Sequence, residues 1–432
     1  MQRIKQTTSL MPQDQVFWYL DKQSPKRLHG TIKTDVVVVG GGMAGLSAAQ
    51  SFRDKGCSVV LLEKNYCGAG ASGKSSGFIT PASEYNVSDL VRLFGQHEAN
   101  RLWQFACSGV QSIKKNIEAF GIDCDYQQQD SLLVANSSSA YAKITSEYDA
   151  HQKLSYKSQL YDKAALASIV RSPEYYGGVS YPDTFGINTY RYCQAMKATL
   201  ETSGVQIFEE TPVVTVHANG VDTVDARLEA DHIIVCVDRF APDLKLLAND
   251  VFCAQTFLML SAPLSDATIK QLFPDRPFMV WDSDLLYYYY RIIEGNRLMI
   301  GGTNLTSIFW GKEQHNSRTM VTALQGYAKK KFPNIVINFE YFWPGLIGIS
   351  KDILPIADYD SVMPKVYYIN AVAGLPWAAA LGRYSADKIL DKRDDLDHYF
   401  SLTRKFPVGL LAQSIVGKRI AFGLSNLTML YK

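Results

Sequence analysis

Apolar and polar residues form recognisable blocks along this chain. Near its start, residues 35–39 contain four consecutive valines after Asp35, residues 43–53 have the apolar spacing of a helix, and residues 58–62 contain four consecutive apolar residues after Ser58. Unbroken runs of this length are typical of strands covered on both faces of a parallel sheet. The pattern therefore predicts a strand, a helix and a second, parallel strand.

Similar helix and strand patterns occur in the rest of the chain, but a series of consecutive strands separates them. Helices are expected twice within residues 89–120 and at 140–151, 188–203 and 376–390. Strands are expected at 130–136, 205–208, 213–216, 231–237, 251–261, 278–281, 285–293, 297–301, 339–343 and 366–370, with a hairpin turn at Asn219-Gly220. The strands between residues 251 and 301 follow one another without a helical pattern of similar strength. This order favours an antiparallel sheet inserted between parallel units.

The predicted fold class is α/β, with a Rossmann-type domain and an inserted, mainly antiparallel β-sheet domain of the α+β kind. Three segments are expected to form the first domain: 1–120, 183–250 and 344–405. Two segments, 121–182 and 251–343, are expected to form the second domain, and residues 406–432 a helical tail.

The turn after the first strand carries the glycine spacing of a dinucleotide site. Gly40 permits a sharp turn, Gly42 lets the backbone approach a pyrophosphate, and Gly45 lets the helix pack closely on the strand. The first helical residues, Met43 and Ala44, would offer N–H groups to the phosphates. Glu63, after the second strand, would bind a ribose hydroxyl, which favours FAD or NAD over NADP. Its neighbour Lys64 is expected at the same end of the site.

A stretch of small residues follows at 68–77. Residues such as Gly70, Ala71, Ser72 and Ser75 predict a loop of exposed backbone N–H groups, suited to an extended anionic ligand. A flexible linker is the alternative interpretation. The position just after the second strand favours a flavin nucleotide, because an NAD site needs no such loop there. Lys74 lies within this loop and is expected to face either the flavin or solvent.

Composition excludes several functions. The 432 residues contain 44 basic and 42 acidic side chains, for a net charge of +2, so nothing suggests binding to nucleic acid. The seven cysteines form no CxxC pair and the seven histidines are dispersed, so we expect no metal site and reduced thiols in a cytoplasmic protein. The N-terminus resembles no signal peptide. The apolar stretch at 407–430 is interpreted as a docked terminal helix or as a contact with a membrane surface.

These motifs resemble the D-amino-acid-oxidase superfamily of flavoenzymes, in particular the branch with glycine oxidase, sarcosine oxidase and γ-glutamylputrescine oxidoreductase. The similarity extends from Phe17-Trp18-Tyr19 through the small-residue loop to Tyr287–Arg291, Gly301-Gly302 and 342–356. It implies FAD as cofactor in a GR2-like domain. It also implies that Val213, or else Val214, contacts the adenine. The remaining residues implied to contact the cofactor are Gly345, Gly374, Leu375, Pro376 and Trp377.

Two departures from the family concern the substrate. Ile347 stands where amino-acid oxidases of this family carry an arginine that grips the substrate carboxylate, and an apolar side chain cannot form that clamp. This favours amines, or a carboxylate bound elsewhere. Leu375 stands where a histidine is frequent, so a histidine contact to the flavin is not expected there. Pro376 still suits the first turn of a helix aimed at the flavin.

The second domain is expected to supply the substrate pocket. Side chains of Tyr287 to Tyr290 alternate between the two faces of a strand, so one pair should point inward. Tyr288 and Tyr290, together with Arg291 and Trp377, are the candidate substrate-contacting residues. The alternatives are an aromatic face that only packs, a structural ion pair at Arg291, and a core position for Trp377.

The sequence therefore predicts an FAD-dependent oxidoreductase that oxidises a C–N bond of a small amine or N-substituted amino acid to an imine, which water then hydrolyses. The acceptor of the electrons, oxygen or a quinone, is left open. The alternatives are an electron-transfer or macromolecule-modifying flavoenzyme of the same fold, and a non-catalytic flavin-binding protein.

Overall fold

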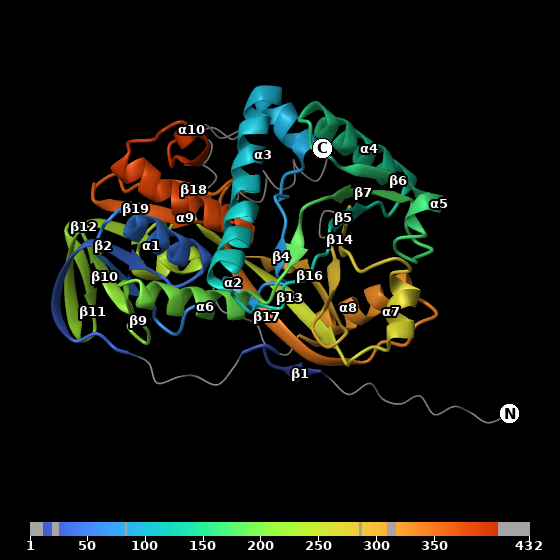
Figure 1. Ribbon diagram of the computed structural model, residues 1–432, viewed down its shortest axis with the longest axis horizontal. Helices are drawn as coiled ribbons and strands as arrows, with labels where there is room; N and C mark the ends of the chain where they lie inside the picture. Colours follow the sequence, from blue (N-terminus) through green and yellow to red (C-terminus); the bar gives the residue numbers. More distant parts are fainter. Residues whose placement is uncertain (1–11, 20–25, 83, 285–286, 309–316, 405–432) are drawn as a thin grey trace.

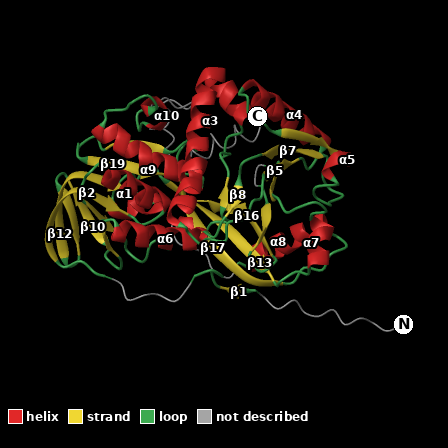
Figure 2. Cartoon of the chain, in the orientation of Figure 1, coloured by secondary structure: helices red, strands yellow, loops and turns green. Residues whose placement is uncertain are grey.

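The computed structural model describes residues 12–19, 26–82, 84–284, 287–308 and 317–404. Two sheets lie next to each other, and most of the helices cover their outer faces (Figures 1 and 2). A long helix, α3, runs across the region between them (Figure 1). The arrangement agrees with the predicted α/β class with an antiparallel sheet inserted.

The first sheet has a parallel centre. β12 pairs in parallel with β2 and β19, β2 with β3, and β3 with β9, while the β10–β11 hairpin adds an antiparallel edge. Its strands are β2 (Gly30–Val39), β3 (Val59–Leu62), β9 (Gln206–Phe208), β10 (Val213–His217), β11 (Gly220–Thr223), β12 (Ala226–Val235), β18 (Ile356–Tyr359) and β19 (Val366–Asn370).

The apolar run of β2 is buried on both faces. Val36 and Val38 belong to a core shared with helices α1 (Met43–Asp54), α6 (Thr189–Thr202) and α9 (Leu375–Leu390). Val37 and Val39 belong to a second core, which includes the 3-10 helix η1 (Asp238–Leu244). Because neighbouring side chains point to opposite faces, an unbroken run of valines supplies both cores.

The second sheet is mainly antiparallel, in the order β1-β17-β13-β16-β15-β14-β5-β7-β6. Its strands are β1 (Gln13–Asp14), β5 (Ser131–Val134), β6 (Gln159–Asp162), β7 (Gly177–Tyr181), β13 (Phe252–Ser261), β14 (Met279–Asp282), β15 (Tyr289–Ile293), β16 (Arg297–Ile308) and β17 (Phe339–Ile349). Helices α7 (Asp266–Leu272) and α8 (Arg318–Lys331) pack on one face, and α4 (Ser138–Lys153) and α5 (Lys163–Leu166) lie near β7.

Three features differ from the expected boundaries. β1 and the last residues of β17, to Ile349, pair within the second sheet, although both fall in segments assigned to the first domain. The expected loop at 68–77 contains a short helix, α2 (Ala71–Lys74). A separate two-stranded sheet, β4 (Phe78–Ile79) with β8 (Phe185–Gly186), follows it. The division into domains otherwise remains a prediction.

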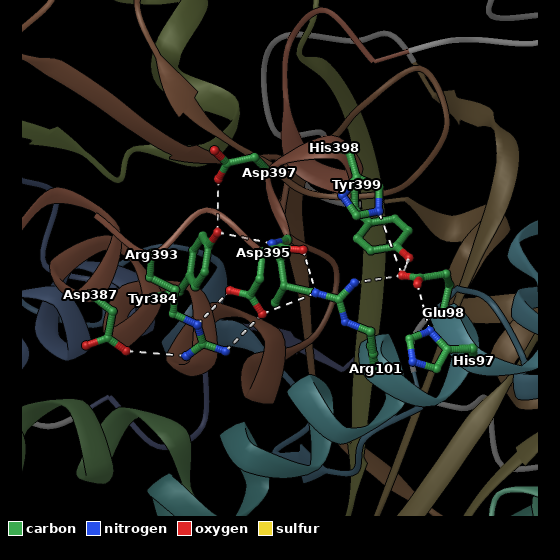
Figure 3. Close-up of polar contacts among 11 residues, drawn as sticks. His97, Glu98, Arg101, Tyr384, Asp387, Arg393, Asp395, Asp397, His398 and Tyr399 are labelled. Atoms are coloured by element: carbon green, nitrogen blue, oxygen red, sulfur yellow. Dashed lines mark hydrogen bonds and ion pairs between the residues drawn. The ribbon is translucent and has the colours of Figure 1, made fainter. Parts of the chain in front are cut away.

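The helical pattern at 89–120 corresponds to α3 (Val87–Phe120), which Gly95 interrupts with a φ of 80°. Two helices therefore meet at a kink, as the sequence predicts. Beyond α9, a polar network ties the short helix α10 (Asp397–Phe400) and the preceding loop to α3 and α9 (Figure 3). Arg101 of α3 contacts Asp395, and Tyr399 donates a hydrogen bond to Glu98.

Within these described ranges, none of the helices is long and apolar enough to cross a membrane. The apolar stretch at 407–430 lies outside the described residues, so both interpretations of it remain predictions.

Candidate cofactor and substrate cleft

A cleft of about 1740 Å³ connects the two sheets. On one side it is lined by the turn after β2, the end of β3 and the start of β10. On the other it is lined by β13, the end of β14, the start of β15 and the segments that lead into α3. The cleft therefore joins the predicted dinucleotide turn to the second sheet.

The turn after β2 has the geometry that its glycines predict. Gly40 has a φ of 108°, and a Cβ there would lie 2.4 Å from the carbonyl oxygen of Cys236. A Cβ on Gly45 would lie 1.9 Å from the carbonyl oxygen of Gly40. Gly42 caps α1 without any side-chain hydrogen bond, and the first turn of α1 faces the cleft. Side chains at these positions would break the contact between turn and helix.

Glu63 lies at the end of β3 beside this turn. Its carboxylate accepts hydrogen bonds from the backbone N–H groups of Gly41 and Asn65, both at 2.8 Å. Burial raises the pKa of this carboxyl, and the two hydrogen bonds counteract that effect. Next to it, the Lys64 ammonium lies 3.0 Å from the centre of the Phe240 ring. Glu63 is thus fixed as an acceptor at the edge of the cleft.

The small-residue loop repeats the geometry of the first turn. A Cβ on Gly73 would lie 2.0 Å from the carbonyl oxygen of Gly68, which has a φ of 79°. Ser72 accepts a hydrogen bond from the N–H of Met43 at 2.9 Å, so the loop caps α1. The indoles of Trp18 and Trp343 donate to the carbonyl oxygens of Gly73 and Lys74. The loop is therefore fixed by protein contacts, which contradicts the linker interpretation, and the Met43 N–H is already in use.

Two later segments complete the floor of the cleft. Gly345, Leu346 and Ile347 of β17 line it, so an apolar side chain occupies the position of the family's arginine. Helix α9 begins there, with Gly374 as its cap at a φ of 105° and no side-chain hydrogen bond. Beside them, the Asp238 carboxylate accepts a hydrogen bond from the N–H of Gly348 at 2.6 Å. Burial raises the pKa of Asp238 to about 6.

The two valines predicted as alternatives for contacting the adenine are neighbours at the start of β10. Both Val213 and Val214 line the cleft. Val213 pairs with Thr223, but the register shifts before Thr215, so Val214 lies in a bulge between paired residues. A bulge leaves backbone groups outside the ladder, where a ligand can use them.

The residues along the cleft fit FAD. Two helices of twelve and sixteen residues, α1 and α9, begin at this cleft with glycine caps that carry no side chain. Apart from the Met43 N–H, which donates to Ser72, their positive ends face the cleft, where an anion or a polarised carbonyl would be stabilised. Most of the predicted cofactor residues line it: Gly40, Gly42, Met43, Ala44, Glu63, Lys64, Gly70, Ala71, Ser72, Ser75, Val213, Gly345, Gly374, Leu375 and Pro376. Gly45 does not line the cleft, because it packs against the Gly40 carbonyl on the other side of the turn.

The structure places the tyrosines differently from the prediction. Tyr288 stacks on Tyr327 with ring centres 4.4 Å apart, and Tyr290 is fully buried with its hydroxyl 3.0 Å from that of Tyr175. Both belong to the core beneath α8. Tyr287 and Tyr289 line the cleft instead. The prediction of Tyr288 and Tyr290 as substrate contacts was therefore wrong, although one pair does point inward.

Arg291 and Trp377 also lie outside the cleft lining. The Arg291 guanidinium is completely buried and donates to the carbonyl oxygens of Ser76 and Ile187, each at 2.7 Å. Burial lowers its pKa to about 10. Trp377 is buried against Phe105 and donates to the carbonyl oxygen of Pro81 at 3.2 Å. Both residues hold segments of the fold together rather than facing a ligand.

Two signals for the inward pair were present in the sequence. Side chains alternate along a strand, so Arg291 lies on the same face as Tyr287 and Tyr289. A regular strand therefore cannot present Tyr288, Tyr290 and Arg291 together to one pocket. In addition, a Cβ on Gly301 would lie 2.3 Å from the Tyr289 ring, so this glycine makes room for the ring. Glu84, whose carboxylate also lines the cleft, had no such signal because it lies in an irregular segment.

In the part of the chain that the structure describes, the cysteines and the potential metal ligands can be located. All seven cysteines are free. Among the residues with described positions, no group of three or more His, Cys, Asp or Glu side chains is arranged to hold a metal ion.

Comparison with known proteins gives matches over most of the chain. Residues 35–388 match the family described as DAO, FAD dependent oxidoreductase. A probable oxidoreductase OrdL of Haemophilus influenzae is 27% identical over 91% of this chain and 89% of its own. Gamma-glutamylputrescine oxidoreductase of Escherichia coli is 25% identical over 88% of this chain and 90% of its own. The crystal structure of glycine oxidase from Geobacillus kaustophilus superposes with a TM-score of 0.73 at 19% identity, covering 88% of this chain and all of that one.

Proposed function

Because the chain belongs to the DAO family of FAD-dependent oxidoreductases, we propose that it oxidises the C–N bond of an amine or N-substituted amino acid. The substrate loses two electrons and two protons, one as a hydride from carbon and one from nitrogen, and its C–N single bond becomes C=N. Water then hydrolyses the imine to a carbonyl compound and an amine. FAD supplies the two-electron acceptor for this step.

One observation carries the proposal. A single cleft joins the dinucleotide turn to a wall formed by Phe78, Tyr287, Tyr289 and Ile347. Phe78 and Tyr289 meet edge to face with ring centres 5.8 Å apart. With Ile347 at the position of the carboxylate clamp, this wall suits the alkyl part of an amine better than the carboxylate of a simple amino acid. A relative named for a putrescine derivative supports an amine substrate.

The residues of this chain would provide position and electrostatics rather than a nucleophile. Gly40, Gly42 and Glu63 would hold the nucleotide, and Ser72 would keep the loop against α1. The start of α9 at Gly374 would place its positive end near the cofactor, where negative charge on the reduced ring would be stabilised. The aromatic wall would exclude water and fix the C–H bond that breaks.

Anaerobic reduction of the purified flavoprotein tests the proposal. We expect loss of the oxidised-flavin absorption with at least one member of a panel of secondary amines, polyamine derivatives and N-methyl amino acids. Reoxidation by oxygen and by a quinone, compared after reduction, identifies the acceptor. A flavin that stays oxidised with every amine and amino acid would contradict the proposal and favour the electron-transfer or non-catalytic alternative.

A further inference from the structure

Glu84 places a carboxylate at the lining of the cleft. It accepts a hydrogen bond from the Tyr287 hydroxyl at 3.1 Å. Across the described ranges of the chain, no Lys, Arg or His side chain forms an ion pair with it. Although solvent in the cleft reaches the side chain, protein surrounds it, and this desolvation raises the pKa of the carboxyl, while the bond from Tyr287 lowers it.

The tyrosine that donates to this carboxylate belongs to a group of aromatic rings. The Tyr287 and Tyr289 rings lie 5.9 Å apart, and Tyr289 contacts Phe78. Gly301 makes room for the Tyr289 ring, as described above. Trp281 and Tyr85 also line this part of the cleft. A carboxylate bonded to one ring of an aromatic group suits an alkylammonium ion, which the negative charge and the ring quadrupoles attract together.

Charged groups of both signs line the cleft besides Glu84. Arg92 lines the cleft but pairs with Asp89 at 3.1 Å. Asp282 and Asp284 add negative charge at the end of β14. Lys74 and Lys143 also line the cleft, and the Lys74 Cβ would lie 3.8 Å from a Cβ on Gly345, beside Ile347. An ammonium group that reaches Glu84 meets a carboxylate that forms no ion pair among the described residues.

We propose that Glu84, held by Tyr287, binds a second, protonated amino group of the substrate, so that the enzyme prefers diamine-type substrates to monoamines of the same length. The inference rests on the proposed amine oxidation and specifies its substrate class. The reacting amine must be neutral to lose a hydride from its carbon, whereas the distal amine stays charged. Glu84 therefore recognises a group that takes no part in the chemistry.

Two measurements on the FAD-loaded protein test this assignment. The first is the ratio of kcat/KM for 1,4-diaminobutane to that for 1-aminobutane. The second is calorimetric binding of both amines to the chemically reduced protein, which cannot oxidise them. Loss of a charged hydrogen-bonded contact predicts that Glu84→Gln lowers the preference for the diamine by about ten- to a hundredfold in both measurements. Tyr287→Phe should lower it by a smaller factor, because the carboxylate remains.

Asp243→Asn is the matched control. It removes the same charge from the lining of the cleft, but in η1 at the predicted nucleotide end, and it does not touch the bond between Tyr287 and Glu84, so the preference should stay within about twofold of wild type. Equal preference for both amines in wild type, or a preference that Glu84→Gln leaves unchanged, would overturn the inference while amine oxidation stands. Failure of every amine to reduce the flavin would instead overturn the proposed function and this inference with it.

Discussion

The nucleotide end of the cleft is built from backbone, whereas the end formed by the second sheet is built from side chains. At the nucleotide end, glycines at 40 and 45 bring a turn and a helix into contact that any Cβ would block. At the other end, Tyr287, Tyr289 and Glu84 define the surface, and the backbone only presents them. Backbone geometry constrains which residues are possible, while a side-chain surface can change with little effect on the fold. The difference explains why the first end binds a shared cofactor and the second can differ in substrate.

The largest effect is expected at the glycine that packs α1 on β2. Gly45→Ala places a Cβ 1.9 Å from the carbonyl oxygen of Gly40, and we expect a loss of about 3 kcal/mol or more in the free energy of unfolding, together with loss of bound flavin. Denaturant unfolding and flavin content measure both. The control is Gly326→Ala in α8, where no atom lies within 4 Å and stability should stay equal or rise. Equal behaviour of the two variants would contradict this account of the turn.

The second prediction separates a structural arginine from a substrate clamp. Arg291→Met leaves the carbonyl oxygens of Ser76 and Ile187 without their donor, so we expect roughly 2 to 5 kcal/mol less free energy of unfolding. The variant should retain the KM of the wild type at a temperature where it is folded. A KM that rises for carboxylate-bearing substrates but not for amines would instead show that Arg291 binds the substrate.

A third test compares neighbouring tyrosines on opposite faces of β15. Tyr289→Leu changes the cleft wall, so we expect kcat/KM for the best amine to fall at least about tenfold with little change in stability. Tyr290→Leu leaves a gap in the core beside Tyr175, so stability should fall by about 2 kcal/mol or more while kcat/KM stays near wild type. The reverse pattern would mean that the sheet presents its other face to the substrate.

The smallest effect concerns the pH dependence contributed by Asp238. Its pKa rises from 3.8 to about 6 in the folded protein, so the folded state binds this proton more tightly and the carboxyl favours folding most at low pH. The unfolding free energy of the wild-type apoprotein, relative to Asp238→Asn, should fall by about 1 to 2 kcal/mol as pH rises from about 4 to about 6, and then stay level. Denaturant titrations across this range measure the difference. A difference that does not vary with pH would show that Asp238 titrates normally.

Much of the fold could be predicted because its signals are local. The buried strands at 36–39 and 59–62, the helix at 43–54 and the kinked pair within 87–120 follow from runs of apolar residues, helical spacing and a glycine. Most of the residues proposed to hold the cofactor line one cleft for the same reason, since Gly40, Gly42 and Glu63 occur at fixed spacing within one strand–helix–strand unit.

The substrate end could not be predicted to the same degree. Glu84 lies in an irregular segment and meets Tyr287 only because two distant parts of the chain fold together. The alternation at 287–290 predicted two faces, but which face is inward depends on α8, which covers Tyr288 and Tyr290. Arg291 was predicted to contact the substrate, but in the structure its guanidinium donates hydrogen bonds to two backbone carbonyl oxygens.

By itself, the sequence determined the dinucleotide turn, the order of parallel and antiparallel units and the absence of an arginine at Ile347, because each depends on residues close together in the chain. Only the tertiary structure decided which tyrosines face the cleft, that Arg291 and Trp377 are structural, and that Glu84 meets Tyr287 at the cleft lining. The physical reason is that the backbone angles of adjacent residues determine a turn. The lining of the cleft depends instead on how segments far apart in the chain pack against each other.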